Sequence, residues 1–170
     1  MTTFLIFRVV HILLAAIWVG ATAATTFYFV PAITEARAAG GQVMAGVMKR
    51  GYSAMLSSIA GIVMLSGIYL YQHVTNGFDP VVSGSMMARV FGVGGVAGIV
   101  ATVLGSMVGA RARKVTALMQ QAAPMPDGPE KGALLGQAAV HQQTMATFSL
   151  ITIVMMLIAI VTMSIGHYIG

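Results

Sequence analysis

The four histidines are the residues of this chain best suited to chemistry, because it has no cysteine and only four acidic residues. The lack of cysteine excludes a disulfide framework, a thiolate zinc site and a cysteine nucleophile. His11 lies seven residues inside the first long apolar segment, which places it about 10 Å deep if that segment is a helix. His73 and His167 lie at the ends of the second and fourth apolar segments. A titratable side chain inside a membrane span is costly, so His11 is the first candidate for a functional residue.

Arginine and tryptophan side chains accompany these histidines. Steps of three and seven residues put Arg8, His11 and Trp18 on one face of a helix, and Arg89 opens the third apolar segment. Imidazoles from facing helices can ligate haem iron, and guanidinium groups can pair with haem propionates. We therefore predict a haem b site. Its candidate residues are His11 with His73 or His167 as axial ligands, Arg8 and Arg89 beside the propionates, and Trp18 in the cavity wall.

Four helices that cross a membrane would position these residues. The 170-residue chain is 58% hydrophobic and 8% charged, whereas an ordinary soluble domain has about 25% charged residues. Four segments have the roughly 20 mostly apolar residues that a helix needs to cross the hydrocarbon core. They run from about 4 to 31, 52 to 72, 87 to 110 and 144 to 169. We predict an all-α fold, namely a single domain that forms an integral membrane four-helix bundle.

Basic residues are confined to two of the three loops, which predicts the orientation of the chain. The first loop has Arg37, Lys49 and Arg50, the third has Arg111, Arg113, Lys114 and Lys131, and the second has none. Because cytoplasmic loops are enriched in Lys and Arg, we expect both basic loops inside and both termini on the outer side. His141 then lies at the cytoplasmic boundary. The net charge of +5 reflects this topology, and with no extramembrane domain we expect no nucleic-acid binding.

The segments around the first and third loops carry three further expectations. The first apolar segment is too long for the h-region of a signal peptide, so we expect it to remain as a helix. The first loop, TEARAAGGQVMAGVMKR, has little room for a fold of its own. After the third segment, the residues RARKVTALMQQ are expected to extend its helix beyond the membrane.

A stripe of small residues marks one face of the third segment. Its glycines are Gly94, Gly98, Gly105 and Gly109. Helices in lipid associate by close packing of such residues, so the stripe favours packing inside the bundle. It leaves open a homodimer or docking to a larger membrane complex.

Two other kinds of function stay open. Thioether and imidazole ligands suit Cu(I), and Met163 and His167 lie four residues apart on one helix face, so copper could be bound with His11. Most of the 14 methionines, however, lie in apolar runs where they serve packing. The chain could also be a non-catalytic accessory subunit of a larger membrane complex, a role that suits its small extramembrane mass.

The segment FRVVHILLAAIWVGATAATTFYFVPAI has His11 and Trp18 seven residues apart and a small and aromatic stretch that ends at Pro31. In these features the first half of the chain resembles the CopD-like and HemJ-like group of small integral membrane proteins. The segment KRGYSAMLSSIAGIVMLSGIYLY is similar to the start of the second helix of HemJ-type proteins. These families imply a multi-pass protein of the bacterial inner membrane.

The resemblance implies either haem or copper chemistry. HemJ-type proteins bind haem b and act as protoporphyrinogen IX oxidases, and CopD proteins are associated with copper uptake or resistance. By resemblance, His11 is the position of the essential histidine of HemJ-type proteins. Arg89 stands near their essential lysine, and arginine cannot be deprotonated as lysine can. The resemblance therefore favours a haem-binding bundle over that particular enzyme.

These observations together predict a membrane protein that binds haem b. The haem would serve electron transfer or a redox reaction on a membrane-soluble partner, such as a quinone or a porphyrin. If the protein is an enzyme, it is expected to be a membrane oxidoreductase.

Overall fold

The computed structural model describes residues 1–169, apart from the side chains of Arg37, Ala38 and His167, and within this part it contains helices and no strand. The prediction of an all-α protein is confirmed. The helices are α1 (Thr2–Ala24), the π-helix η1 (Thr25–Phe29), α2 (Val30–Glu35), α3 (Arg37–Lys49), α4 (Tyr52–Val74), α5 (Pro80–Ser83), α6 (Met86–Ala122), α7 (Pro129–Ile165) and the 3₁₀-helix η2 (Gly166–Tyr168).

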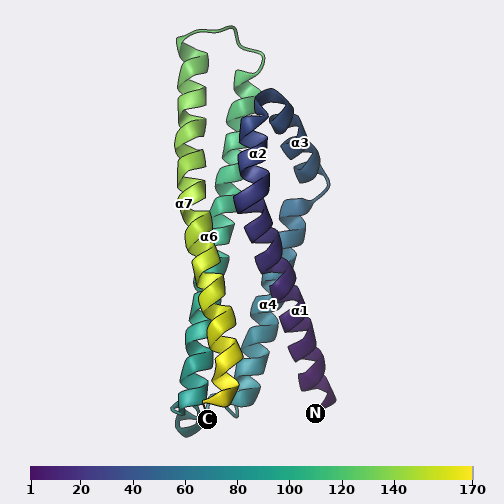
Figure 1. The fold of residues 1–170 in the computed structure, drawn as a ribbon, viewed down its shortest axis with the longest axis vertical. Helices are drawn as coiled ribbons and strands as arrows, with labels where there is room; N and C mark the ends of the chain where they lie inside the picture. Colours follow the sequence, from purple (N-terminus) through teal and green to yellow (C-terminus); the bar gives the residue numbers. More distant parts are fainter. Residues whose placement is uncertain (170) are drawn as a thin grey trace.

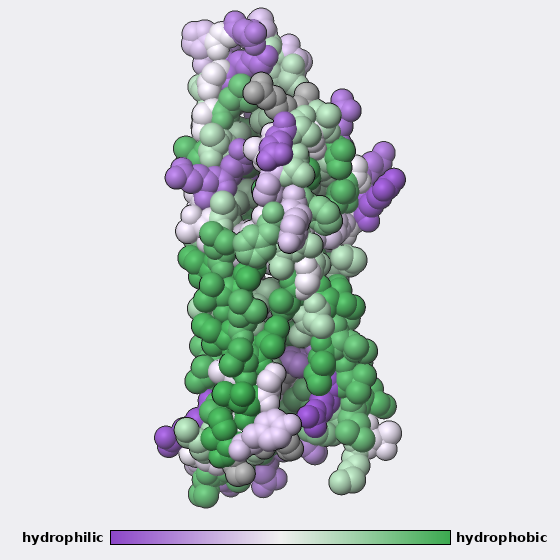
Figure 2. All heavy atoms as spheres, in the orientation of Figure 1, coloured by the Kyte–Doolittle hydropathy of each residue, from purple (hydrophilic) through white to green (hydrophobic). Residues whose placement is uncertain are grey.

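Four of the helical stretches in the described part are long and apolar enough to cross a membrane. They are Thr2–Glu35, Tyr52–Val74, Met86–Ala122 and Pro129–Ile165. Each contains most of one predicted segment, and α6 continues through RARKVTALMQQ as expected. In Figure 2, hydrophobic side chains form a broad band around the visible face, with hydrophilic side chains gathered above it and at its lower edge. This band is the surface that lipid would cover.

The long helices pack mainly as two antiparallel pairs. Helix α1 packs along α4, and α6 packs along α7, while α4 and α6 make the larger contact between the pairs. A small core joins them, formed by Trp18, Ala60, Val63, Ala101 and Met156. Figure 1 shows both termini at one end, which we call the terminal end, and the α2–α3 corner with the α6–α7 loop toward the other, which we call the basic end.

The first connection contains a helix that the sequence pattern does not predict. Helix α3 has 13 residues and turns back against α2 at the basic end (Figure 1). The two helices approach so closely at Gly40 that an added Cβ would overlap the carbonyl oxygen of Ile33. Gly51 then adopts a φ of +81°, which glycine tolerates without steric cost, and starts α4. Most of the predicted first loop is therefore the helix α3.

A π-helical turn widens the first long helix where α4 begins beside it. The N–H group of Val30 donates to the carbonyl of Thr25, and Pro31 follows at the start of α2. Proline has no N–H group to continue the regular helical ladder, which explains a change of helix type at this point. The Thr25 hydroxyl donates to the Ala21 carbonyl at 2.7 Å and is also hydrogen-bonded to the hydroxyl of Tyr52.

Replacing Tyr52 with phenylalanine tests this contact between the first helix and α4. We expect Tyr52→Phe to lower the free energy of unfolding in mild detergent by about 0.6 kcal/mol, the usual size of a hydrogen bond between membrane helices. Tyr28→Phe is the control, because the Tyr28 side chain is exposed. Equal effects of the two substitutions would show that the Thr25 contact does not stabilise the protein.

Candidate functional site

His11 is held in the contact between α1 and α4. Its Nδ1 atom lies 3.0 Å from the Val63 carbonyl oxygen and 3.0 Å from the Ser66 hydroxyl oxygen. A carbonyl oxygen only accepts hydrogen bonds, so Nδ1 must donate, and the neutral ring then has its lone pair on Nε2. The Ser66 hydroxyl donates to Ile62 at 2.7 Å, which leaves its oxygen free to accept from the imidazole. Histidines that bind metals commonly have their second ring nitrogen fixed in this way.

Gly67 allows the imidazole to approach α4. A Cβ at this position would lie 3.0 Å from Cε1 of His11, which is tighter than ordinary van der Waals contact. Val63, Ser66 and Gly67 therefore form the bed of the His11 ring, and none of them was predicted as a site residue. The serine and glycine about four turns along the second predicted helix were a usable signal, whereas the Val63 carbonyl was not, since every residue has one.

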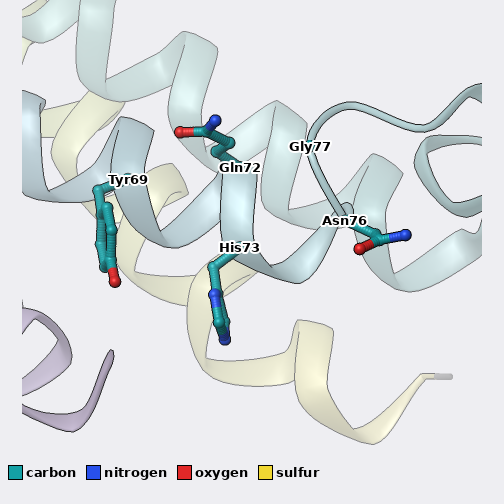
Figure 3. Close-up of a pocket in the computed structure, with 5 residues that line it drawn as sticks. All are labelled: Tyr69, Gln72, His73, Asn76 and Gly77. Atoms are coloured by element: carbon teal, nitrogen blue, oxygen red, sulfur yellow. The ribbon is translucent and has the colours of Figure 1, made fainter. Parts of the chain in front are cut away.

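Aromatic rings from α1 and α4 contact one another between His11 and the terminal end. We call Phe4, Phe7, Tyr69 and His73 the aromatic seam. The Phe4 and His73 rings have centroids 4.7 Å apart, the Phe7 and Tyr69 rings 4.3 Å, and Tyr69 stacks toward His73 at 6.3 Å. In Figure 3, Tyr69 and His73 project from the same side of α4, whereas Gln72 projects from another side.

The structure does not bring His11 and His73 together. The partner of His11 on α4, Ser66, is seven residues from His73, which corresponds to about 10 Å along a helix. The Phe7–Tyr69 pair lies between them. Among the described side chains there is no group of three or more potential metal ligands of the His, Cys, Asp or Glu type. The side chain of His167, the other predicted axial ligand, lies outside the described part.

The remaining predicted site residues lie in different surroundings. Arg8 and Arg89 are exposed, and neither has a carboxylate within ion-pair distance among the side chains that the structure describes. Trp18 is 7% exposed and belongs to the core cluster, seven residues along α1 from His11. It packs between the helix pairs instead of lining a hollow.

Two hollows lie on α4, one near each end of that helix. The first has a volume of about 310 Å³ and is lined by Tyr69, Gln72, His73, Asn76 and Gly77 (Figure 3). The second has a volume of about 250 Å³ and is lined by Val47, Arg50, Gly51, Tyr52 and Met55. His11 lines neither of them, so its bed on α4 and these hollows are separate features.

The four glycines of the α6 stripe lie in different surroundings. Gly94 is buried against α7, where an added Cβ would lie 2.6 Å from the Thr162 hydroxyl oxygen. A Cβ at Gly98 or Gly105 would have no other atom within 4 Å, and at Gly109 the nearest is Arg113 at 3.9 Å. Packing against α7 therefore explains Gly94, whereas packing between the described helices does not explain the other three glycines of the stripe.

The fold and the site define a class of protein, namely an all-helical chain with four potential membrane spans and a half-buried histidine in one helix contact. Comparison of the chain with protein-family models, with curated proteins and with solved structures finds no match.

Proposed function

We propose that this chain is a multi-pass membrane protein that binds haem b through His11. The observation that carries the proposal is the hydrogen bond from Nδ1 of His11 to the Val63 carbonyl, since it leaves Nε2 available as a ligand of iron. The ring also lies half-buried within a potential membrane span. Titratable groups are energetically costly there and mark functional sites by default, which adds support to the proposal.

The orientation of the chain belongs to the same proposal. The basic end contains Lys49, Arg50, Arg111, Arg113, Lys114 and Lys131. Under the positive-inside rule this end faces the cytoplasm, and the terminal end with both termini faces outward. His11 then lies in the outer half of the inner membrane of a bacterium.

Among the described histidines, His11 is the one that we propose as the ligand of the haem iron. His11 would hold the iron through Nε2, and Arg8 and Arg89, which have no carboxylate partner among the described side chains, would pair with the propionates. A second imidazole from His73 would require the Phe7–Tyr69 pair to separate. When bound, haem supplies a one-electron carrier, which suits electron transfer or redox chemistry on a membrane-soluble quinone or porphyrin.

An absorption spectrum of the purified protein tests the proposal. In mild detergent, after expression with haem available, we expect a sharp Soret band and an α-band on reduction with dithionite. We expect His11→Ala to remove most of this absorbance, because no other described histidine occupies an equivalent bed. His141→Ala is the matched control and should keep the spectrum, since His141 lies on α7 toward the basic end.

Three outcomes would overturn the proposal. A colourless preparation with stoichiometric copper would favour copper handling by His11 and the methionines. A colourless preparation that co-purifies with large membrane proteins would favour an accessory subunit. A haem spectrum that survives His11→Ala would show that the haem is bound elsewhere.

A further inference from the structure

The hollow at the start of α4 is lined by apolar side chains, a tyrosine ring and one arginine. Val47 of α3 and Met55 of α4 provide apolar side chains, Tyr52 provides a ring, and Arg50 lies in the turn between the two helices. The volume of about 250 Å³ is too small for a protein segment of any length, but it is large enough for a polar headgroup with the first carbons of an acyl chain.

Tyrosines place this hollow at the level of the lipid headgroups. Tyr52 is hydrogen-bonded to Thr25 in the first helix, and Tyr28 lies one turn further along that helix with 73% of its side chain exposed. Tyrosine is enriched at the boundary between the hydrocarbon core and water, where its ring is apolar and its hydroxyl is hydrated. The candidate membrane span of α4 begins at Tyr52, so we expect the hollow to open near the phosphates of a membrane.

The charge around the hollow is uncompensated. Lys49 and Arg50 are exposed, and neither has a carboxylate within 4.0 Å among the side chains that the structure describes. The ion pair that the described part does contain joins Lys131 to Asp127, in and just after the α6–α7 loop. There the hydrogen bond and the charge of Lys131 lower the pKa of the Asp127 carboxyl group. A ligand for the hollow is therefore expected to bring the negative charge that the protein lacks.

We propose that this hollow binds one anionic phospholipid of the cytoplasmic leaflet, such as phosphatidylglycerol. The phosphodiester pairs with Arg50, and the upper part of an acyl chain lies against Val47, Tyr52 and Met55. A guanidinium group binds phosphate through parallel N–H donors, and cytoplasmic basic residues close to a membrane attract anionic lipids. The proposal requires the membrane orientation given above, but it is independent of haem.

Native mass spectrometry of the delipidated protein in neutral detergent, titrated with phosphatidylglycerol, tests the site. Detergent removes the surface potential of a membrane, so only a built site retains lipid. We expect Arg50→Gln to weaken binding by about tenfold, the loss that follows from removing a charged hydrogen bond. Lys114→Gln, an exposed basic residue at the same end, should leave binding unchanged. Arg50→Lys keeps the charge and should restore most of the affinity.

Two further ligands distinguish a built lipid site from general surface electrostatics. Phosphatidylcholine should bind at least tenfold more weakly, and inorganic phosphate should not displace the lipid, because it has no acyl chain to occupy the hollow. If Arg50→Gln and Lys114→Gln have equal effects, the basic surface as a whole attracts the lipid and the proposal is wrong. It is also wrong if phosphatidylcholine binds as well as phosphatidylglycerol. Unchanged thermal unfolding of Arg50→Gln in detergent confirms that the variant is folded.

Discussion

Gly40→Ala is expected to detach α3 from α2 at the basic end. The new Cβ would overlap the Ile33 carbonyl oxygen and lie 2.7 Å from the carbonyl carbon, and both are backbone atoms. A flexible side chain could move aside, but here the two helices must separate, because their backbones are in contact. Forced overpacking of this kind costs about 1–3 kcal/mol, and we expect at least about 2 kcal/mol here.

Hydrogen exchange of the α3 amides measures this effect locally. A loss of about 2 kcal/mol corresponds to exchange about 30-fold faster over Arg37–Lys49, with little change in α7. Gly41→Ala is the control, since its Cβ would meet no other atom within 4 Å. Alanine also has the higher helix propensity, so Gly41→Ala should leave exchange unchanged or slow it. Similar exchange in the two variants would contradict the close approach of α2 and α3.

Gly94→Ala is expected to weaken the contact between α6 and α7. Its Cβ would lie 2.6 Å from the Thr162 hydroxyl oxygen and 3.1 Å from Cγ of Met163. The hydroxyl cannot rotate away without loss, because it donates to the Ile158 carbonyl at 2.8 Å. We expect the free energy of unfolding in mixed micelles to fall by about 2 kcal/mol, within the range for overpacking.

A rescue variant makes this prediction specific. Thr162→Ala removes the hydroxyl oxygen, so adding it to Gly94→Ala should recover about half of the lost stability, with the contact to Met163 remaining. Gly98→Ala, one turn further along α6, should change stability by less than about 0.5 kcal/mol because its Cβ would have open space. If Gly98→Ala is as destabilising as Gly94→Ala, another surface must cover Gly98, such as a second copy of this chain.

Apolar length was enough to predict the four long helices, whereas α3 required information that the sequence pattern does not contain. A run of about 20 apolar residues has few alternatives to a helix in a membrane. Helix α3 is different, because three glycines in RAAGGQVMAGVMK lower its helix propensity. Its stability comes from tertiary packing at Gly40, which follows from the position of Ile33 in another helix.

The sequence predicted the central residue of the candidate site, His11, but not the residues that surround it. His11 stood out because a titratable residue deep in an apolar segment is rare. Its hydrogen-bond partner at Val63 is a backbone carbonyl, which leaves no trace in the amino-acid types. Trp18 was predicted in the wall of a haem cavity, and the structure places it in the packed core, seven residues along α1 from His11. Helical spacing placed His11 and Trp18 on the same face of the first helix, but it did not show which residues each of them contacts.

The pairing of α1 with α4 bears on which substitutions the protein tolerates around His11. His11, the residues of its bed and the whole aromatic seam belong to one continuous stretch of chain, from Phe4 to His73. Substitutions in α6 or α7 away from the core residues Ala101 and Met156 are therefore expected to leave the hydrogen bond of His11 unchanged. The first half of the chain therefore supplies every residue that directly contacts the His11 imidazole, and the second half supports it from behind through Ala101 and Met156, which pack in the same core as Val63.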